Sequence, residues 1–205
     1  GAVYVVMGPV NGALSLADAD MKYIGESAGD KLGTSVSSAG DIDGDGTLDF
    51  VTGAVFDDAA GADCGAAYVV LGDMSSTGGD ISELASLKIV GESSNDNFGA
   101  NLAADGDIDG DGTNDFIIGA PTTDVVADSS GTVYVFYGNG AGTVDASASA
   151  SINASEADAR FEGDLLEDKL GASVGYVGDI DGMGERDAFI IGAAQDDAGG
   201  IDAGA

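Results

Sequence analysis

A nine-residue acidic segment occurs three times in this chain of 205 residues. In the first two copies, carboxylates occupy positions one, three, five and nine, and glycine occupies position six. The copies span residues 41–49, 107–115 and 179–187. Glycine permits a tight turn, so these carboxylates can converge on one point, where they repel each other unless a cation lies between them. A ligand set made only of oxygen atoms is typical of calcium, and the segments therefore predict calcium-binding loops.

In the first two copies we predict four side-chain ligands and one backbone carbonyl ligand per loop. The ligands of the first loop would be Asp41, Asp43, Asp45, Asp49 and the carbonyl of Thr47. Those of the second would be Asp107, Asp109, Asp111, Asp115 and the carbonyl of Thr113. Water would complete six or seven oxygens. The alternative is a turn rich in Asp and Gly that holds no metal, which leaves four like charges together without compensation.

The third copy has Met183 where the other two have an acid. A thioether is a poor ligand for a hard cation, so we expect a weak or degenerate third site beside two strong ones. Arg186 is an alternative source of positive charge within this loop. The remaining ligands would be Asp179, Asp181, Asp187 and the carbonyl of Glu185.

The acidic segments belong to a longer internal repeat, which predicts three units at about residues 1–64, 65–130 and 131–203. The segments start at residues 41, 107 and 179, so the period is 66 and then 72 residues. The six additional residues lie between Gly138 and Gly163, which marks this connection as a surface loop.

Each period contains four short strand candidates, two of them nearly continuous apolar runs bounded by glycine. The candidates are residues 34–39, 50–53, the Tyr-Val segment within 65–72, and 87–90, together with their counterparts in the other periods. Residues 152–160 are rich in Ala and Glu and are expected to form a loop. Four strands per period predict an all-β fold of β-propeller blades, each made of four antiparallel strands, with the acidic loop between strands one and two. The whole chain would be a partial or split propeller.

An EF-hand is a poorer interpretation of the acidic loops. A strand candidate, not a helix, follows each loop. Thr52 and Ile118 also occupy the twelfth position, where an EF-hand has Glu.

In sequence the periods resemble the FG-GAP repeat of integrin α-subunit β-propellers and their bacterial relatives. The middle period has the most complete signature, which is Phe98-Gly99, then Gly106 to Gly112, then Gly119-Ala120-Pro121. The resemblance implies a propeller with calcium in its blade loops, an extracellular or cell-surface setting, and a role in adhesion or scaffolding. It does not identify a ligand.

The charge balance excludes several classes of partner. The chain has 37 acidic and 6 basic residues, a formal net charge of −31 and no His. Nucleic acids and anionic lipids are bound by clusters of Lys and Arg, so neither is expected as a partner. No apolar stretch is long enough to insert into a membrane. Cys64 is the only cysteine, which excludes an intrachain disulfide.

These observations favour a non-enzymatic, calcium-stabilised extracellular propeller for adhesion or protein–protein interaction, with an unknown protein or glycan ligand. The alternative is a structural protomer of an extracellular filament or sheath that self-associates through half-blades, because the first strand candidate is a third strand and the last is a second. Catalysis is disfavoured because the usual nucleophile and base pairs are missing. Two further sets of recurring residues are expected to be structural: acids of turns (Glu26, Asp30, Glu92, Asp96, Asp168) and packed tyrosines (Tyr4, Tyr68, Tyr134).

Overall fold

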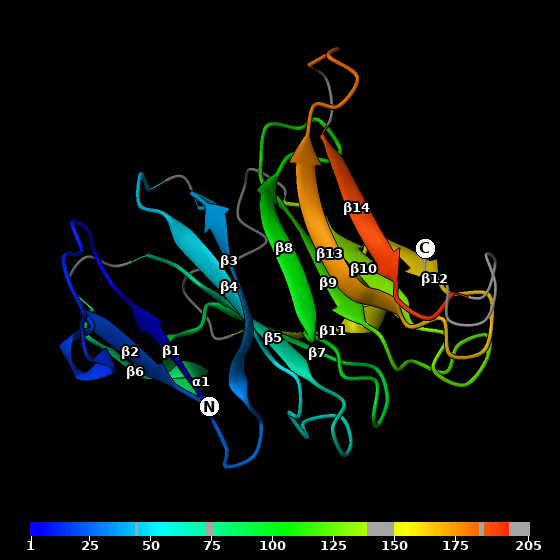
Figure 1. The fold of residues 1–205 in the computed structure, drawn as a ribbon, viewed down its shortest axis with the longest axis horizontal. Helices are drawn as coiled ribbons and strands as arrows, with labels where there is room; N and C mark the ends of the chain where they lie inside the picture. Colours follow the sequence, from blue (N-terminus) through cyan, green and yellow to red (C-terminus); the bar gives the residue numbers. More distant parts are fainter. Residues whose placement is uncertain (44, 73–75, 139–149, 185–186, 197–205) are drawn as a thin grey trace.

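The computed structural model is an all-β arrangement of successive sheets (Figure 1). It describes residues 1–43, 45–72, 76–138, 150–184 and 187–196. Among these residues the strand orders are β1-β2-β6, β11-β7-β5-β4-β3, β12-β10-β9-β8 and β13-β14.

The four strands expected in each period form where the sequence predicts them, with slightly different ends. The first strands are β3 (Leu32–Gly40), β8 (Asn101–Gly106) and β13 (Leu170–Gly178). The second strands are β4 (Asp49–Ala54), β9 (Asp115–Ala120) and β14 (Ala188–Ala193). The third strands are β1 (Ala2–Val5), β5 (Ala66–Val70) and β10 (Thr132–Phe136). The fourth strands are β2 (Met21–Ile24), β7 (Leu87–Val90) and β12 (Ala159–Glu162). Neighbouring strands among these pair antiparallel.

The hydrophobic core lies between successive sheets. Strands β5, β9 and β10 are buried along their whole length, as expected for apolar runs with both faces covered. Edge-to-face aromatic pairs join one sheet to the next at equivalent places. Tyr23 packs on Phe50 with ring centroids 5.2 Å apart, and Phe161 packs on Phe189 at 5.7 Å.

Glycine permits the closest approach of neighbouring sheets. A Cβ atom on Gly53 would lie 2.0 Å from the carbonyl oxygen of Gly99, and one on Gly119 would lie 2.3 Å from that of Gly171. Both carbonyl-bearing glycines have positive φ, 82° for Gly99 and 87° for Gly171. The glycines of β4 and β9 therefore each abut a left-handed glycine at the start of the next sheet, which explains the constant spacing of these residues.

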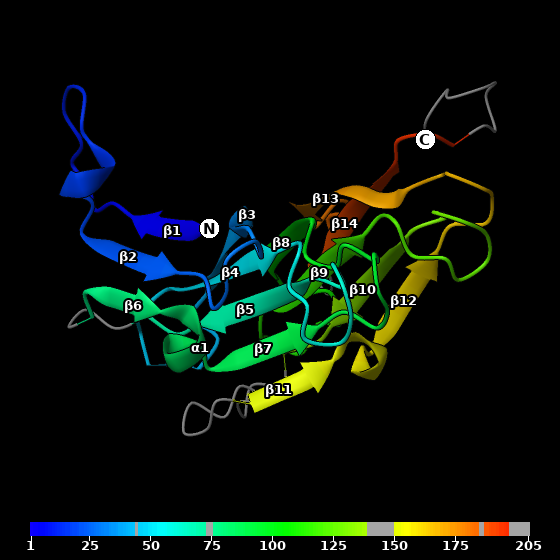
Figure 2. The same ribbon diagram turned by 90° about the horizontal axis from the view of Figure 1, so that it is seen from below.

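The structure adds two short strands that the sequence analysis did not predict. These are β6 (Gly78–Asp80), which pairs parallel with β2, and β11 (Ala150–Asn153), which pairs parallel with β7. Each one precedes the fourth strand of its own repeat but pairs with the fourth strand of the preceding repeat (Figure 2). The sheet containing β3, β4, β5 and β7 therefore has five strands, not the four expected.

The prediction of a loop at residues 152–160 is wrong. This segment holds the end of β11, a 3-10 turn at Ala154–Glu156 and the start of β12. Asn153 caps the turn, because its side chain accepts a hydrogen bond from the amide of Ser155 at 2.9 Å. The single turn of α-helix α1 (Ile81–Leu84) begins in the same way, with Asp80 accepting from the amide of Ser82.

Candidate metal centres

All three acidic loops leave their sheets at the same end of the molecule, at the top of Figure 1, where each joins a first strand to a second strand. Their turns share one backbone contact. The amide at position six donates to Oδ2 of the first aspartate at 2.9 Å in every copy. The pairs are Gly46 with Asp41, Gly112 with Asp107, and Gly184 with Asp179. The repeated sequence therefore folds into the same tight turn three times.

Carboxylates cluster closely in the first two loops. Each of Asp41, Asp43 and Asp49 offers one oxygen, and these oxygens lie within 4.8 Å of one another. The second loop repeats this arrangement with Asp107, Asp109 and Asp115. Three carboxylates within this distance are a suitable partial shell for a divalent cation bound by oxygen.

The acids at position five, Asp45 and Asp111, accept hydrogen bonds from backbone amides of their own turn. Oδ1 of Asp45 accepts the amide of Thr47 at 2.6 Å, and Oδ1 of Asp111 accepts that of Thr113 at 2.8 Å. Both aspartates are exposed and support the turn. Their role as metal ligands, and that of the Thr47 and Thr113 carbonyls, stays a prediction.

The aspartate at position nine is buried in both loops and connects the loop to the end of the third strand. Oδ2 of Asp49 accepts the amide of Ile42 at 2.7 Å, and Oδ1 accepts that of Gly72 at 2.7 Å. Asp115 makes the same two contacts, with Ile108 at 2.6 Å and Gly138 at 2.7 Å. From its spacing this residue is predicted only as a ligand, and the structure adds hydrogen bonds that link the loop to the sheet.

Burial raises the pKa of both position-nine aspartates. For Asp49 the nearby charges of Asp43 and Asp41 add to this effect. Burial raises the pKa of Asp115 to about 6, and the charge of Asp109 adds to it. The ionised forms of Asp49 and Asp115 are therefore disfavoured in isolation, and a bound cation would favour them.

The third loop differs at the same position. Oδ2 of Asp187 accepts from the hydroxyl of Tyr176 and from the amide of Asp107, the latter at 3.2 Å. The amide of Asp187 also donates to the carbonyl of Asp107 at 2.8 Å. Among the described residues, Asp179 and Asp181 form no close three-carboxylate cluster with Asp187. Glu185 and Arg186 lie outside the described residues, and the weaker third site stays a prediction.

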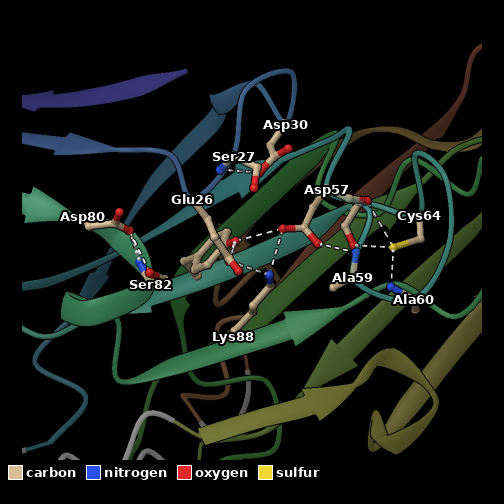
Figure 3. Close-up of polar contacts among 12 residues, drawn as sticks. Glu26, Ser27, Asp30, Asp57, Ala59, Ala60, Cys64, Asp80, Ser82 and Lys88 are labelled. Atoms are coloured by element: carbon tan, nitrogen blue, oxygen red, sulfur yellow. Dashed lines mark hydrogen bonds and ion pairs between the residues drawn. The ribbon is translucent and has the colours of Figure 1, made fainter.

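A second polar group, which no sequence motif predicted, lies at the end of the sheets opposite the acidic loops. Figure 3 shows its contacts. Nζ of Lys88 lies 2.7 Å from Oε2 of Glu26 and 2.8 Å from Oδ2 of Asp57. The hydroxyl of Tyr68 lies 2.9 Å from each of the same two oxygens. These four residues come from two connections, β2–β3 and β4–β5, and from two strands, β5 and β7. Glu26, Asp57 and Lys88 also line a cavity of about 270 Å³.

The surroundings shift the pKa of two residues in this polar group, Lys88 and Tyr68. Burial acts to lower the pKa of Lys88, but hydrogen bonds to Asp57 and Glu26 and their charges raise it overall. Burial, together with the charge of Asp57, raises the pKa of Tyr68. The lysine is therefore held as a cation that compensates two carboxylates, and only 3% of the Asp57 side chain is exposed. Tyr68 packs in the core as expected, with this polar contact in addition.

Three of the acids interpreted as turn residues are confirmed in that role. Asp30, Asp96 and Asp168 are buried, and each accepts the backbone amide of the residue three positions earlier. The distances are 2.9 Å from Ser27, 2.8 Å from Ser93 and 2.9 Å from Leu165. Each hydrogen bond stabilises a turn within the connection from one sheet to the next.

Parts of the chain are similar to known proteins. Residues 98–136 match the family model of the FG-GAP repeat. Integrin alpha-PS5 of Drosophila melanogaster is 34% identical over 128 residues, which span 62% of this chain and 12% of that protein. The chain thus corresponds to a small part of this relative. None of the helices in the described residues has the length and apolar character needed to span a membrane.

Proposed function

Residues 98–136 are an FG-GAP repeat of the integrin α-like family, and on this premise we propose that the chain is part of a calcium-stabilised, extracellular β-propeller that binds other proteins in adhesion. The three repeats, at about residues 1–64, 65–130 and 131–203, would supply successive blades. Residues 197–203 lie outside the described residues. Two observations support the repeat assignment: equivalent strands form in each repeat, and glycines meet where successive sheets approach.

The observation that carries the calcium proposal is the pair of three-carboxylate clusters. In each cluster, a buried aspartate that is hydrogen-bonded to the sheet lies close to two more accessible aspartates of the loop. A calcium ion bound there would connect the loop to the sheet through Asp49 or Asp115. The ion would thus stabilise the junction of the first, second and third strands rather than react with a substrate.

Interaction with a protein is favoured over catalysis. The only cysteine, Cys64, is buried, and burial raises the pKa of its thiol, which disfavours a nucleophilic thiolate. The chain has no His to act as a base. We infer a structural and binding role, with the ends of rigid sheets presenting the loops to a partner.

Thermal unfolding with and without calcium tests this proposal. Calcium chloride should raise the melting temperature relative to excess EDTA, because calcium binds the folded state preferentially. Magnesium should stabilise less, because it requires a smaller octahedral ligand set. Identical melting curves in calcium and EDTA would contradict the proposal.

Substitution of one accessible aspartate in each cluster shows whether that loop binds a calcium ion. Asp43→Asn and Asp109→Asn should each remove one tight site in calorimetric titration, and the double variant should remove both. Glu83→Gln is a matched control, because Glu83 is an exposed acid on α1, away from the loops. Loss of calcium binding in the control would show that general negative charge, and not the clusters, attracts the ion.

A further inference from the structure

Four exposed aliphatic side chains lie on two adjacent connections at the end of the sheets opposite the acidic loops. Val125 and Val126 lie between β9 and β10, and Leu165 and Leu166 lie between β12 and β13. Their exposed fractions are 46%, 55%, 47% and 59%. Backbone hydrogen bonds join the two connections, from Glu167 to Asp128 at 2.9 Å among others, and both views show them side by side (Figures 1 and 2). We call these four residues the aliphatic patch.

The preceding repeat provides an internal comparison for this patch. Its equivalent positions are Ala59 and Ala60 in one connection and Ser93 and Ser94 in the other, joined by the equivalent hydrogen bond from Asn95 to Ala62. There the structure describes the following four strands, β8, β9, β10 and β12, and all four positions are still exposed. A following repeat therefore does not cover this location, and the larger side chains of the aliphatic patch distinguish these two connections from the equivalent pair one repeat earlier.

Both connections are held in one conformation by carboxylates. Oδ1 of Asp124 accepts the amide of Ser129 at 2.7 Å, and Oδ2 of buried Asp168 accepts the amide of Leu165 at 2.9 Å. These contacts close the loops and leave the aliphatic side chains facing outward. A surface fixed in this way loses little conformational freedom on binding, which favours its use as a docking site.

The charges around the patch define its partner. Asp124, Asp128, Asp164 and Glu167 are exposed on the same two connections, and Lys169 is the one basic residue within them. An exposed apolar group with a polar rim is the pattern of an interaction site, and an acidic rim is complementary to a basic partner. We propose that the aliphatic patch binds a peptide segment of a partner protein in which large apolar side chains alternate with Lys or Arg. This inference extends the proposed function, because it gives that function a binding surface.

The test measures the affinity of a fluorescent peptide of alternating Leu and Lys by anisotropy, in saturating calcium. Val125→Ala/Val126→Ala and Leu165→Ser/Leu166→Ser introduce the residues found at the equivalent positions one repeat earlier. The combined variant should bind the peptide at least about tenfold more weakly, because most of the apolar contact is lost. Asp164→Asn/Glu167→Gln should reduce the dependence of the affinity on salt.

Several controls separate this site from general attraction to an acidic protein. Leu16→Ser alters a side chain of similar exposure, 64%, in the 3-10 turn Leu16–Asp18 between β1 and β2, and should leave the affinity unchanged. A peptide of alternating Ser and Lys should bind the parent and the combined variant equally. Unchanged affinity of the combined variant for the Leu and Lys peptide would overturn the proposal. Binding of the patch to zwitterionic vesicles, or a patch-dependent dimer in sedimentation, would also overturn it.

The calcium dependence of melting is recorded for every variant. A variant that keeps it is folded with its metal sites intact, so loss of peptide binding is then a property of the patch. If calcium has no effect on melting but the peptide still binds at the patch, the calcium proposal fails and the docking proposal stands.

Discussion

Replacement of Lys88 should be far more destabilising than replacement of its counterpart in the next repeat. Lys88 and Arg160 occupy equivalent positions in the fourth strands β7 and β12. Lys88 contacts Glu26 and Asp57 at 2.7 and 2.8 Å, and its side chain is 17% exposed. The Arg160 side chain is 49% exposed and contacts Glu92 at 3.6 Å and Glu162 at 2.8 Å.

The expected magnitudes follow from this difference in burial. Lys88→Met keeps most of the apolar stem but leaves Asp57 without a cation. Removing one partner of a fully buried ion pair costs about 3–5 kcal/mol, and we expect about 2–3 kcal/mol here because Lys88 is partly exposed. For a chain of this size that lowers the melting temperature by about 5–10 °C. Arg160→Met should cost less than about 1 kcal/mol, since exposed ion pairs contribute little.

Circular dichroism during heating, in saturating calcium at neutral pH, measures both variants under the same conditions. The double variant Lys88→Met/Asp57→Asn should be more stable than the sum of the two single effects implies, because Asn leaves no uncompensated charge. Equal losses for Lys88→Met and Arg160→Met would refute the reasoning, as would strict additivity of Lys88→Met and Asp57→Asn.

Three other predictions concern a buried turn residue, a contact between sheets and the third acidic loop. Burial, with smaller contributions from the charges of Glu92 and Asp124, raises the pKa of Asp96 to about 6 from 3.8, so the folded protein binds this proton more readily than the unfolded chain. Stability should therefore rise as the pH falls from about 6 towards 3.8, and urea titrations of Asp96→Asn should show a flatter pH dependence than the parent. Gly119→Ala should lower the urea midpoint strongly, because its Cβ would lie 2.3 Å from a backbone oxygen of the neighbouring sheet, and an unchanged midpoint would contradict this packing. Met183→Asp should turn two tight calcium sites into three by calorimetry, whereas three equal sites in the parent would show that Met183 does not weaken the third.

The strands were predictable from the sequence because their physical signal is local. Apolar runs bounded by glycine locate β4, β5, β9 and β10, and the fixed spacing of glycines reflects the contact of Gly53 with Gly99. Two strands were not predictable, because β6 and β11 are short and derive their conformation from pairing with another repeat. The parallel pairing of Ile152 with Ile89, for example, joins two different repeats, so the β-propensity of either segment alone does not indicate it.

The candidate sites were predictable in part. Spacing alone indicated the clusters at Asp41, Asp43 and Asp49 and at their counterparts in the second loop, since these residues belong to one turn. Spacing could not show that Asp49 also accepts the amide of Gly72, or that Lys88 meets Glu26 across 62 positions of the chain. Such contacts depend on the packing of whole strands.

The two parallel strands β6 and β11 give the chain a direction of assembly. Each covers the outer edge of the sheet that precedes it, so the fourth strand of one repeat is paired on both sides only after the next repeat has emerged. During synthesis from the N-terminus, a free edge open to aggregation would exist for the time needed to make about one repeat. Each new repeat would pair with the exposed edge strand of the sheet before it. Sheets made early would therefore be protected from aggregation by the repeats made later.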